Sequence, residues 1–165
     1  MKIGNTSLWD ISNRVPEIYG ILLFLSLILY FFLCYLAGWI YIVELRMFNM
    51  AILITVVYFA MKQFRRTHGG HMDYFHAFTT GMATAAIGAV GFAAFVLVYL
   101  SIDKRLMEII VAKQPLGIYL NPYIAAFIVF LEGCFSGLFV TFLMSNFLAT
   151  RKPLSRMGDK SQVIQ

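Results

Sequence analysis

The stretch IYGILLFLSLILYFFLCYLAGWI, residues 18–40, decides the fold because it contains no charged residue. A helix needs about 20 consecutive apolar residues to cross the ~30 Å hydrocarbon core of a bilayer, and this block is long enough. The block is too long for the hydrophobic region of a signal peptide, and no small-residue cleavage site follows it. We therefore expect it to remain in the mature protein as a membrane span.

Three further apolar blocks follow and predict spans at about 45–63, 77–102 and 122–148. The second block is short and needs flanking residues to reach spanning length. Of the 165 residues, 61% are hydrophobic and 13% are charged, whereas about a quarter of the residues in a soluble domain are charged. We predict an all-α, integral membrane four-helix bundle in a single domain, residues 1–150, followed by a basic and polar tail, residues 151–165.

The distribution of Lys and Arg predicts the orientation of the spans, because cytoplasmic segments are enriched in these residues. The two terminal segments and the second connection hold nine of the 13 Lys and Arg residues, and the first and third connections hold the other four. We therefore expect both termini in the cytoplasm. The net charge of +5 comes from residues at the ends of the apolar blocks, so we exclude nucleic acid as a partner.

Two segments outside the spans have amphipathic character. Residues 5–19 alternate apolar and charged side chains, with Trp9 and Tyr19 suited to the headgroup region, and predict a short surface helix. In the third connection, Leu106, Ile109 and Ile110 recur at helical spacing and predict a second short helix, which ends before residues 115–117.

Small residues predict where helices pack closely. In lipid, small side chains let helix backbones approach each other, and this close packing drives association. One face of the third span carries six such residues: Ala77, Gly81, Thr84, Ala85, Gly88 and Gly91. The fourth span carries a GxxxG motif continued by two hydroxyl residues: Gly133, Gly137, Thr141 and Ser145. We expect these spans to pack on each other, with docking of another subunit on these residues as the alternative.

A carboxylate interrupts the fourth span at Glu132, within FIVFLEGCFSGLF, residues 127–139. Leaving a charged carboxylate in hydrocarbon costs at least ~2.5 kcal/mol, so intramembrane ionisable residues are candidate functional sites by default. The cores of the other spans contain no second ionisable residue at matching depth. We expect Glu132 to be neutral or hydrogen-bonded at an interface. A contact with a partner protein and the handling of a proton or cation are the alternatives.

No residue pattern indicates catalysis or metal binding. His68, His71 and His76 lie close to Asp73, but two glycines separate the first pair, so we expect solvated loop histidines. Cys34 and Cys134 lie in apolar blocks without metal-ligand spacing. Nucleophile–base sets and phosphate-binding glycine loops are also missing from the sequence. We expect no cofactor, no bound metal and no enzymatic activity.

Short motifs at the span ends resemble a known family. YFHAFTTG, residues 74–81, opens the third span after the basic turn RRTHGG, residues 65–70, and YLSID, residues 99–103, closes it. These features, with Tyr19–Gly20 opening the first span, are similar to the four-span proteins of the Bacteroidota grouped as domain of unknown function 4199, over roughly residues 15–150. Lys104 departs from the proline expected after YLSID. The resemblance implies a bacterial inner-membrane protein without an assigned activity.

These observations predict a function in membrane assembly. We expect an accessory or scaffolding subunit that lies in the lipid bilayer and binds another integral membrane protein or a second copy. The alternative is a small proton-coupled transporter or efflux unit with Glu132 as its coupling group, although the spans lack the central Gly or Pro breaks typical of transporters. A lipid-modifying enzyme is a third possibility that lacks a visible nucleophile–base pair.

Overall fold

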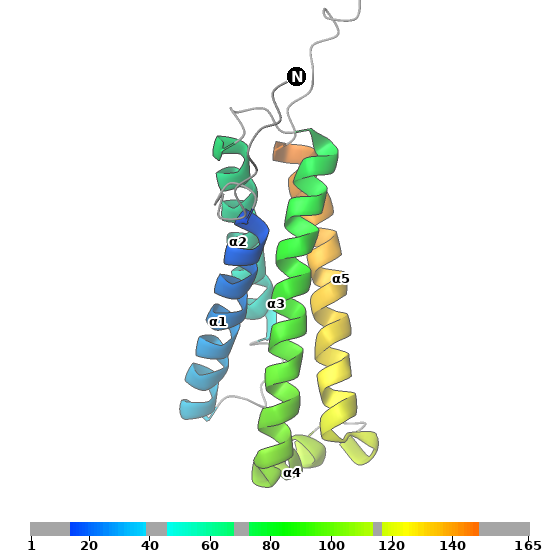
Figure 1. Cartoon of the computed structure of the whole chain (residues 1–165). Coiled ribbons are helices and arrows are strands. Elements are labelled where there is room, and N and C mark those ends of the chain that lie inside the picture. Colours follow the sequence, from blue (N-terminus) through cyan, green and yellow to red (C-terminus); the bar gives the residue numbers. More distant parts are fainter. Residues whose placement is uncertain (1–13, 39–45, 68–72, 114–116, 149–165) are drawn as a thin grey trace, which may run out of the picture.

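The computed structural model describes residues 14–38, 46–67, 73–113 and 117–148, and all regular structure in these ranges is helical. Four long helices run along the bundle in Figure 1: α1 (Val15–Leu36), α2 (Arg46–Thr67), α3 (Tyr74–Ile102) and α5 (Pro122–Leu148). A short helix, α4 (Lys104–Lys113), and a 3-10 turn, η2 (Gly117–Tyr119), connect α3 to α5. All four long helices contain apolar windows long enough to cross a membrane. The predicted all-α membrane four-helix bundle is confirmed.

The helix bounds differ from the predicted spans mainly at polar ends. The helix α2 continues to Thr67 and includes Arg65 and Arg66 in its last turn, because helix geometry does not stop where hydrophobicity does. The first helix ends at Leu36, before the predicted boundary near residue 40. Gly38 has a φ of 71°, and this left-handed conformation, which glycine adopts without strain, ends the helix.

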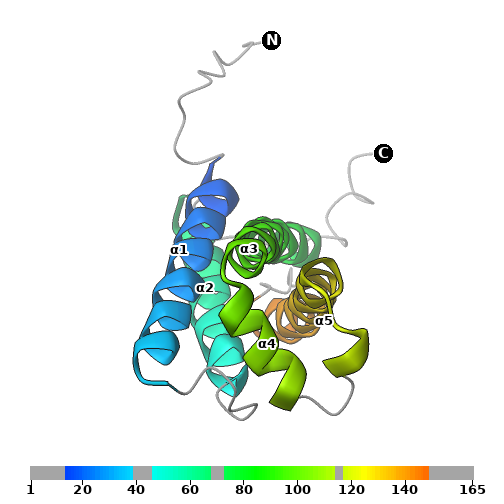
Figure 2. The ribbon, with the colours of Figure 1, turned by 90° about the horizontal axis from the view of Figure 1, so that it is seen from below.

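The long helices form an up-down-up-down bundle. In Figures 1 and 2, α3 lies between α1 and α5, and α2 lies behind it. The contacts between α3 and α5 are the most extensive of any helix pair, followed by those between α1 and α3. The described start of α1, the end of α2, the start of α3 and the end of α5 lie at the same end of the bundle (Figure 1).

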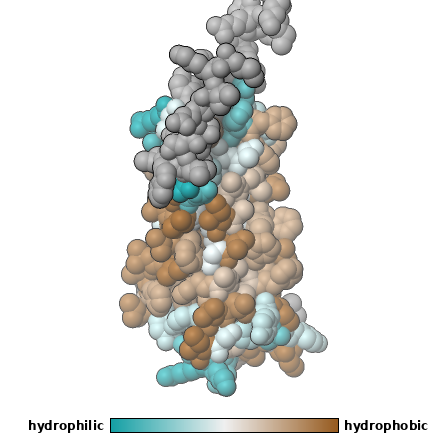
Figure 3. Space-filling view, in the orientation of Figure 1, coloured by the Kyte–Doolittle hydropathy of each residue, from teal (hydrophilic) through white to brown (hydrophobic). Residues whose placement is uncertain are grey.

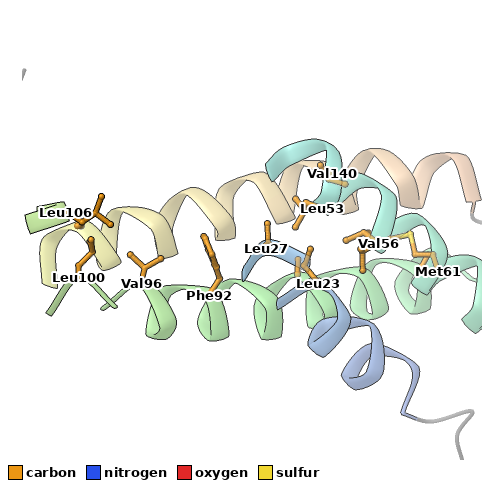
Figure 4. Close-up of a cluster of buried hydrophobic side chains, with 14 residues drawn as sticks. Leu23, Leu27, Leu53, Val56, Met61, Phe92, Val96, Leu100, Leu106 and Val140 are labelled. Atoms are coloured by element: carbon orange, nitrogen blue, oxygen red, sulfur yellow. The ribbon is translucent and has the colours of Figure 1, made fainter. Parts of the chain in front are cut away.

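The core follows α3 and consists of modest apolar side chains. Figure 4 shows ten of its residues, including Leu23 from α1, Met61 from α2 and Val140 from α5, converging on α3. The outside is apolar as well. In Figure 3, brown apolar residues form a band between hydrophilic residues at the two ends. An apolar surface over an apolar core is the arrangement expected when lipid surrounds the helices.

The short helix α4 closes the end of the bundle that lies away from the two described chain ends (Figure 2). Its N-cap is Asp103, whose Oδ1 accepts a hydrogen bond of 3.0 Å from the Leu106 backbone N–H. The Tyr35 hydroxyl of α1 donates to Asp103 Oδ2 at 3.4 Å. Leu106 is buried in the core beside the last turns of α3. The predicted amphipathic helix is therefore confirmed, with its apolar side against the bundle.

Several sequence-based predictions concern residues outside the described ranges. They are the surface helix expected within residues 5–19, which only its last six residues allow to be compared, the loop histidines His68 and His71, and the tail over residues 151–165. Of the predicted surface helix, residues 15–19 belong instead to the first turns of α1, where Pro16 suits the first helical turn.

Candidate functional site

The helix α5 begins at a well-defined cap. Asn121 Oδ1 accepts a hydrogen bond of 2.8 Å from the Ile124 backbone N–H, and this bond satisfies one of the amide groups that a helix start leaves unpaired. Pro122 is the first helical residue and has no N–H that needs a partner. These two residues fix where the fourth span begins.

One side of α5 packs closely against α3 through the GxxxG glycines. A Cβ placed on Gly133 would lie 2.8 Å from Cβ of Ala89, and one placed on Gly137 would lie 2.6 Å from Cβ of Ala85. Both distances are shorter than ordinary carbon–carbon contacts, so only glycine allows this separation of the helices. The predicted packing of the third and fourth spans is therefore present at Ala85, Gly133 and Gly137.

The remaining small residues of α3 face other helices. Gly81 lies against Met61 of α2 and Thr141 of α5. Gly88 and Gly91 pack instead against Leu23 and Phe24 of α1. The sequence identified these glycines as contact points, but the row does not serve α5 alone because α3 touches all three other long helices.

Gly20 completes the contact between α1 and α3. A Cβ on Gly20 would lie 2.7 Å from Cβ of Ile87, which is again too short for an alanine without movement of one helix. The sequence analysis quoted Gly20 only as part of a family-like motif and did not assign it a packing role. Its signal was a single glycine early in an otherwise bulky apolar block.

Four hydroxyl side chains are buried where α3 and α5 meet: Thr80, Thr84, Thr141 and Ser145. Thr84 donates to the backbone oxygen of Thr80 at 2.8 Å, and Ser145 donates to that of Thr141 at 2.7 Å. These bonds stay within one helix and satisfy the hydroxyl groups locally. Within the described ranges, Thr141 Oγ1 is buried and has no hydrogen-bond partner. The hydroxyl row is a packing feature with one unsatisfied oxygen.

Glu132 lies on the opposite side of α5 from this contact and is exposed. It is about ten residues, or ~15 Å, from the start of a helix that is about 40 Å long, and it is therefore close to mid-membrane depth. Three apolar residues on the same side of the helix surround it and are exposed as well: Ile128 (43%), Phe135 (71%) and Phe139 (54%). We call these four residues the Glu132 face. Glu132 also has an interaction within the chain, but the face as a whole points outward.

Metal-binding and redox features are weak in the described part of the chain. There, no group of three or more His, Cys, Asp or Glu side chains is placed to hold a metal ion. His76 is exposed and stacks on Phe64, with ring centroids 6.4 Å apart. Cys34 is buried and Cys134 is half-buried, and both are free thiols. These residues do not form a second candidate site.

The fold and the apolar exterior define the class of this molecule as a multi-pass membrane protein built on a four-helix bundle. The Glu132 face is its most unusual surface, because it exposes a carboxylate where all neighbouring outward side chains are apolar.

The family model described as "Protein of unknown function (DUF4199)" matches residues 18–150. The chain therefore belongs to the DUF4199 family, as its span-end motifs predicted. The comparison with curated proteins found no similar protein, and the comparison with solved structures found none either.

Proposed function

We propose that this protein is a non-catalytic accessory or scaffolding subunit of a larger complex in the bacterial cytoplasmic membrane. The observation that carries the proposal is the exposure of Glu132 on the outer side of α5 near mid-membrane depth. A charged carboxylate in contact with lipid costs at least ~2.5 kcal/mol. A second membrane protein that covers the Glu132 face would remove this cost.

The inward glycines support the same proposal by restricting where a partner can bind. Gly81, Gly88, Gly133 and Gly137 already contact side chains of this chain. A partner must therefore bind on outward surfaces, and among these the Glu132 face is the one with a polar anchor. Phe135 and Phe139 flank the carboxylate and offer aromatic area of the kind that contributes strongly to protein interfaces.

The proposed compartment and orientation rest on the positive-inside rule. Arg14, Arg65 and Arg66 lie at the end of the bundle where the described chain begins and ends. Cytoplasmic segments are enriched in such residues, so we place this end in the cytoplasm. The transporter alternative requires Glu132 to line a water-filled path. The outward position of Glu132 in a single chain favours the subunit role over that alternative.

The proposal is tested by native electrophoresis of the tagged full-length protein after extraction with a mild detergent. We expect the wild-type chain to migrate in a complex well above the mass of the 18.8 kDa chain in its micelle. Phe135→Ala should release the chain from that complex, whereas Phe59→Ala should not, because Phe59 is an exposed phenylalanine on α2. Migration of the wild type at the monomer position in every mild detergent would overturn the proposal.

A further inference from the structure

The charges of this chain restrict what can cover the Glu132 face. In the described ranges, the basic residues with placed side chains lie at helix ends or on α4: Arg14, Lys62, Arg65, Arg66, Lys104, Arg105 and Lys113. None lies at the depth of Glu132, which is ~15 Å from the α4 end of the bundle. Copies of one membrane protein keep the same depth. A second copy therefore brings no cation to Glu132.

A symmetric dimer would be unfavourable for a further reason. A two-fold interface places the same surface patch of both chains in contact, so a dimer centred on the Glu132 face would bring two Glu132 carboxyl groups together. Two carboxylates at close range cannot both remain ionised without a large penalty. Electrostatic complementarity therefore favours a different chain as the occupant of this face.

The apolar members of the Glu132 face define the chemistry of that chain more closely. Phe135 lies three residues after Glu132 on the same side of α5 and is 71% exposed. A cationic side chain placed at Glu132 would also lie near the Phe135 ring, and a desolvated cation gains energy on an aromatic face. Ile128 and Phe139 lie on either side along the helix and would exclude lipid and water from the contact.

We infer that the Glu132 face binds a transmembrane helix of another protein that carries a Lys or Arg side chain at the depth of Glu132. This inference rests on the proposed accessory function and names the chemistry of the partner. The basic side chain neutralises the carboxylate, and the two charges together enter the membrane at a lower cost than either alone.

The test uses synthetic Leu/Ala transmembrane helices that carry a single central residue, either Lys, Gln or Leu. The full-length protein and each helix are labelled for energy transfer and reconstituted in vesicles of phosphatidylcholine and phosphatidylglycerol in a 3:1 ratio. The Lys helix should associate about 3- to 30-fold more tightly than the Leu helix, which is the range expected for polar contacts between membrane helices. Glu132→Gln should remove most of this preference, and Phe135→Ala should reduce it.

Two controls make the result specific. A helix with its Lys moved to one end should show no preference, because its charge lies at the headgroups. Energy transfer between two labelled copies of the protein should be weaker than transfer to the Lys helix. Equal binding of the Lys and Leu helices, or an unchanged preference in Glu132→Gln, would overturn the inference. If native electrophoresis still shows the large complex in that case, the accessory function stands and only the basic chemistry of the partner is wrong.

Discussion

Gly137 of α5 lies directly against Ala85 of α3, so close that a Cβ on Gly137 would be 2.6 Å from the alanine methyl. The two residues belong to the most extensive helix contact in the bundle. Neither atom involved is the flexible end of a long side chain, so the contact cannot absorb added volume by a rotamer change. The separation of α3 and α5 is therefore set at this point.

The first prediction concerns this contact. Gly137→Ala should destabilise the bundle by about 1–3 kcal/mol, which is the usual cost of overpacking. Ala85→Gly in the same chain should restore much of the loss, because the two methyl groups exchange places. The measurement is reversible unfolding in mixed detergent micelles, analysed as a double-mutant cycle. Additive effects of the two substitutions would show that the helices do not meet here.

The second prediction concerns the buried hydroxyl of Thr141, for which the described part of the structure offers no hydrogen-bond partner. Thr141→Val keeps the shape of the side chain and removes the unsatisfied oxygen, so stability should stay unchanged or rise by up to about 1 kcal/mol. Thr84→Val is the matched control, since the Thr84 hydroxyl donates to the Thr80 backbone oxygen. If Thr141→Val proves the more damaging variant, its hydroxyl has a role that this packing does not include.

The third prediction concerns the attachment of α4. Asp103→Ala removes the cap on the Leu106 amide and should weaken α4 locally by about 1 kcal/mol. Asp103→Asn should keep most of the cap, because asparagine caps helices as well as aspartate does. Hydrogen exchange at the first amides of α4 gives the measurement. Equal exchange in all three proteins would mean that Leu106 burial alone holds α4 in place.

The fourth prediction concerns orientation. In a chain with Cys34 and Cys134 replaced, single cysteines at Thr67 and Tyr119 would report on opposite ends of the bundle, and both positions are exposed. A membrane-impermeant thiol reagent should label Tyr119→Cys in cells with a permeabilised outer membrane. Thr67→Cys should react only after the inner membrane is broken. The reverse pattern would invert the proposed topology.

The fold could be predicted from sequence because hydrophobic length alone identifies membrane spans. Residues 18–40 and 122–148 were long, uncharged or nearly so, and flanked by polar residues. The amphipathic period of α4 was also readable, because one side of that helix faces the bundle and the other does not. The end of α1 was placed too late because Gly38, which ends the helix, lies inside an apolar block.

The direction in which each membrane residue points could not be predicted equally well. In water, a helix shows its buried side by an apolar stripe, but in lipid both sides are apolar. The small size of Gly88 and Gly91 indicated close contact without indicating that α1 makes it. For the same reason the sequence gave the depth of Glu132 but not its outward position.

The central claim is that protein, rather than lipid, covers the Glu132 face in the native membrane. A photoreactive phenylalanine analogue at Phe135, in the full-length protein and in native membranes, tests it directly, with the same analogue at the exposed Leu29 of α1 as the control. We predict a protein adduct of defined mass at position 135 that weakens in Glu132→Leu, and mainly lipid adducts at position 29. Lipid adducts alone at both positions would contradict the claim.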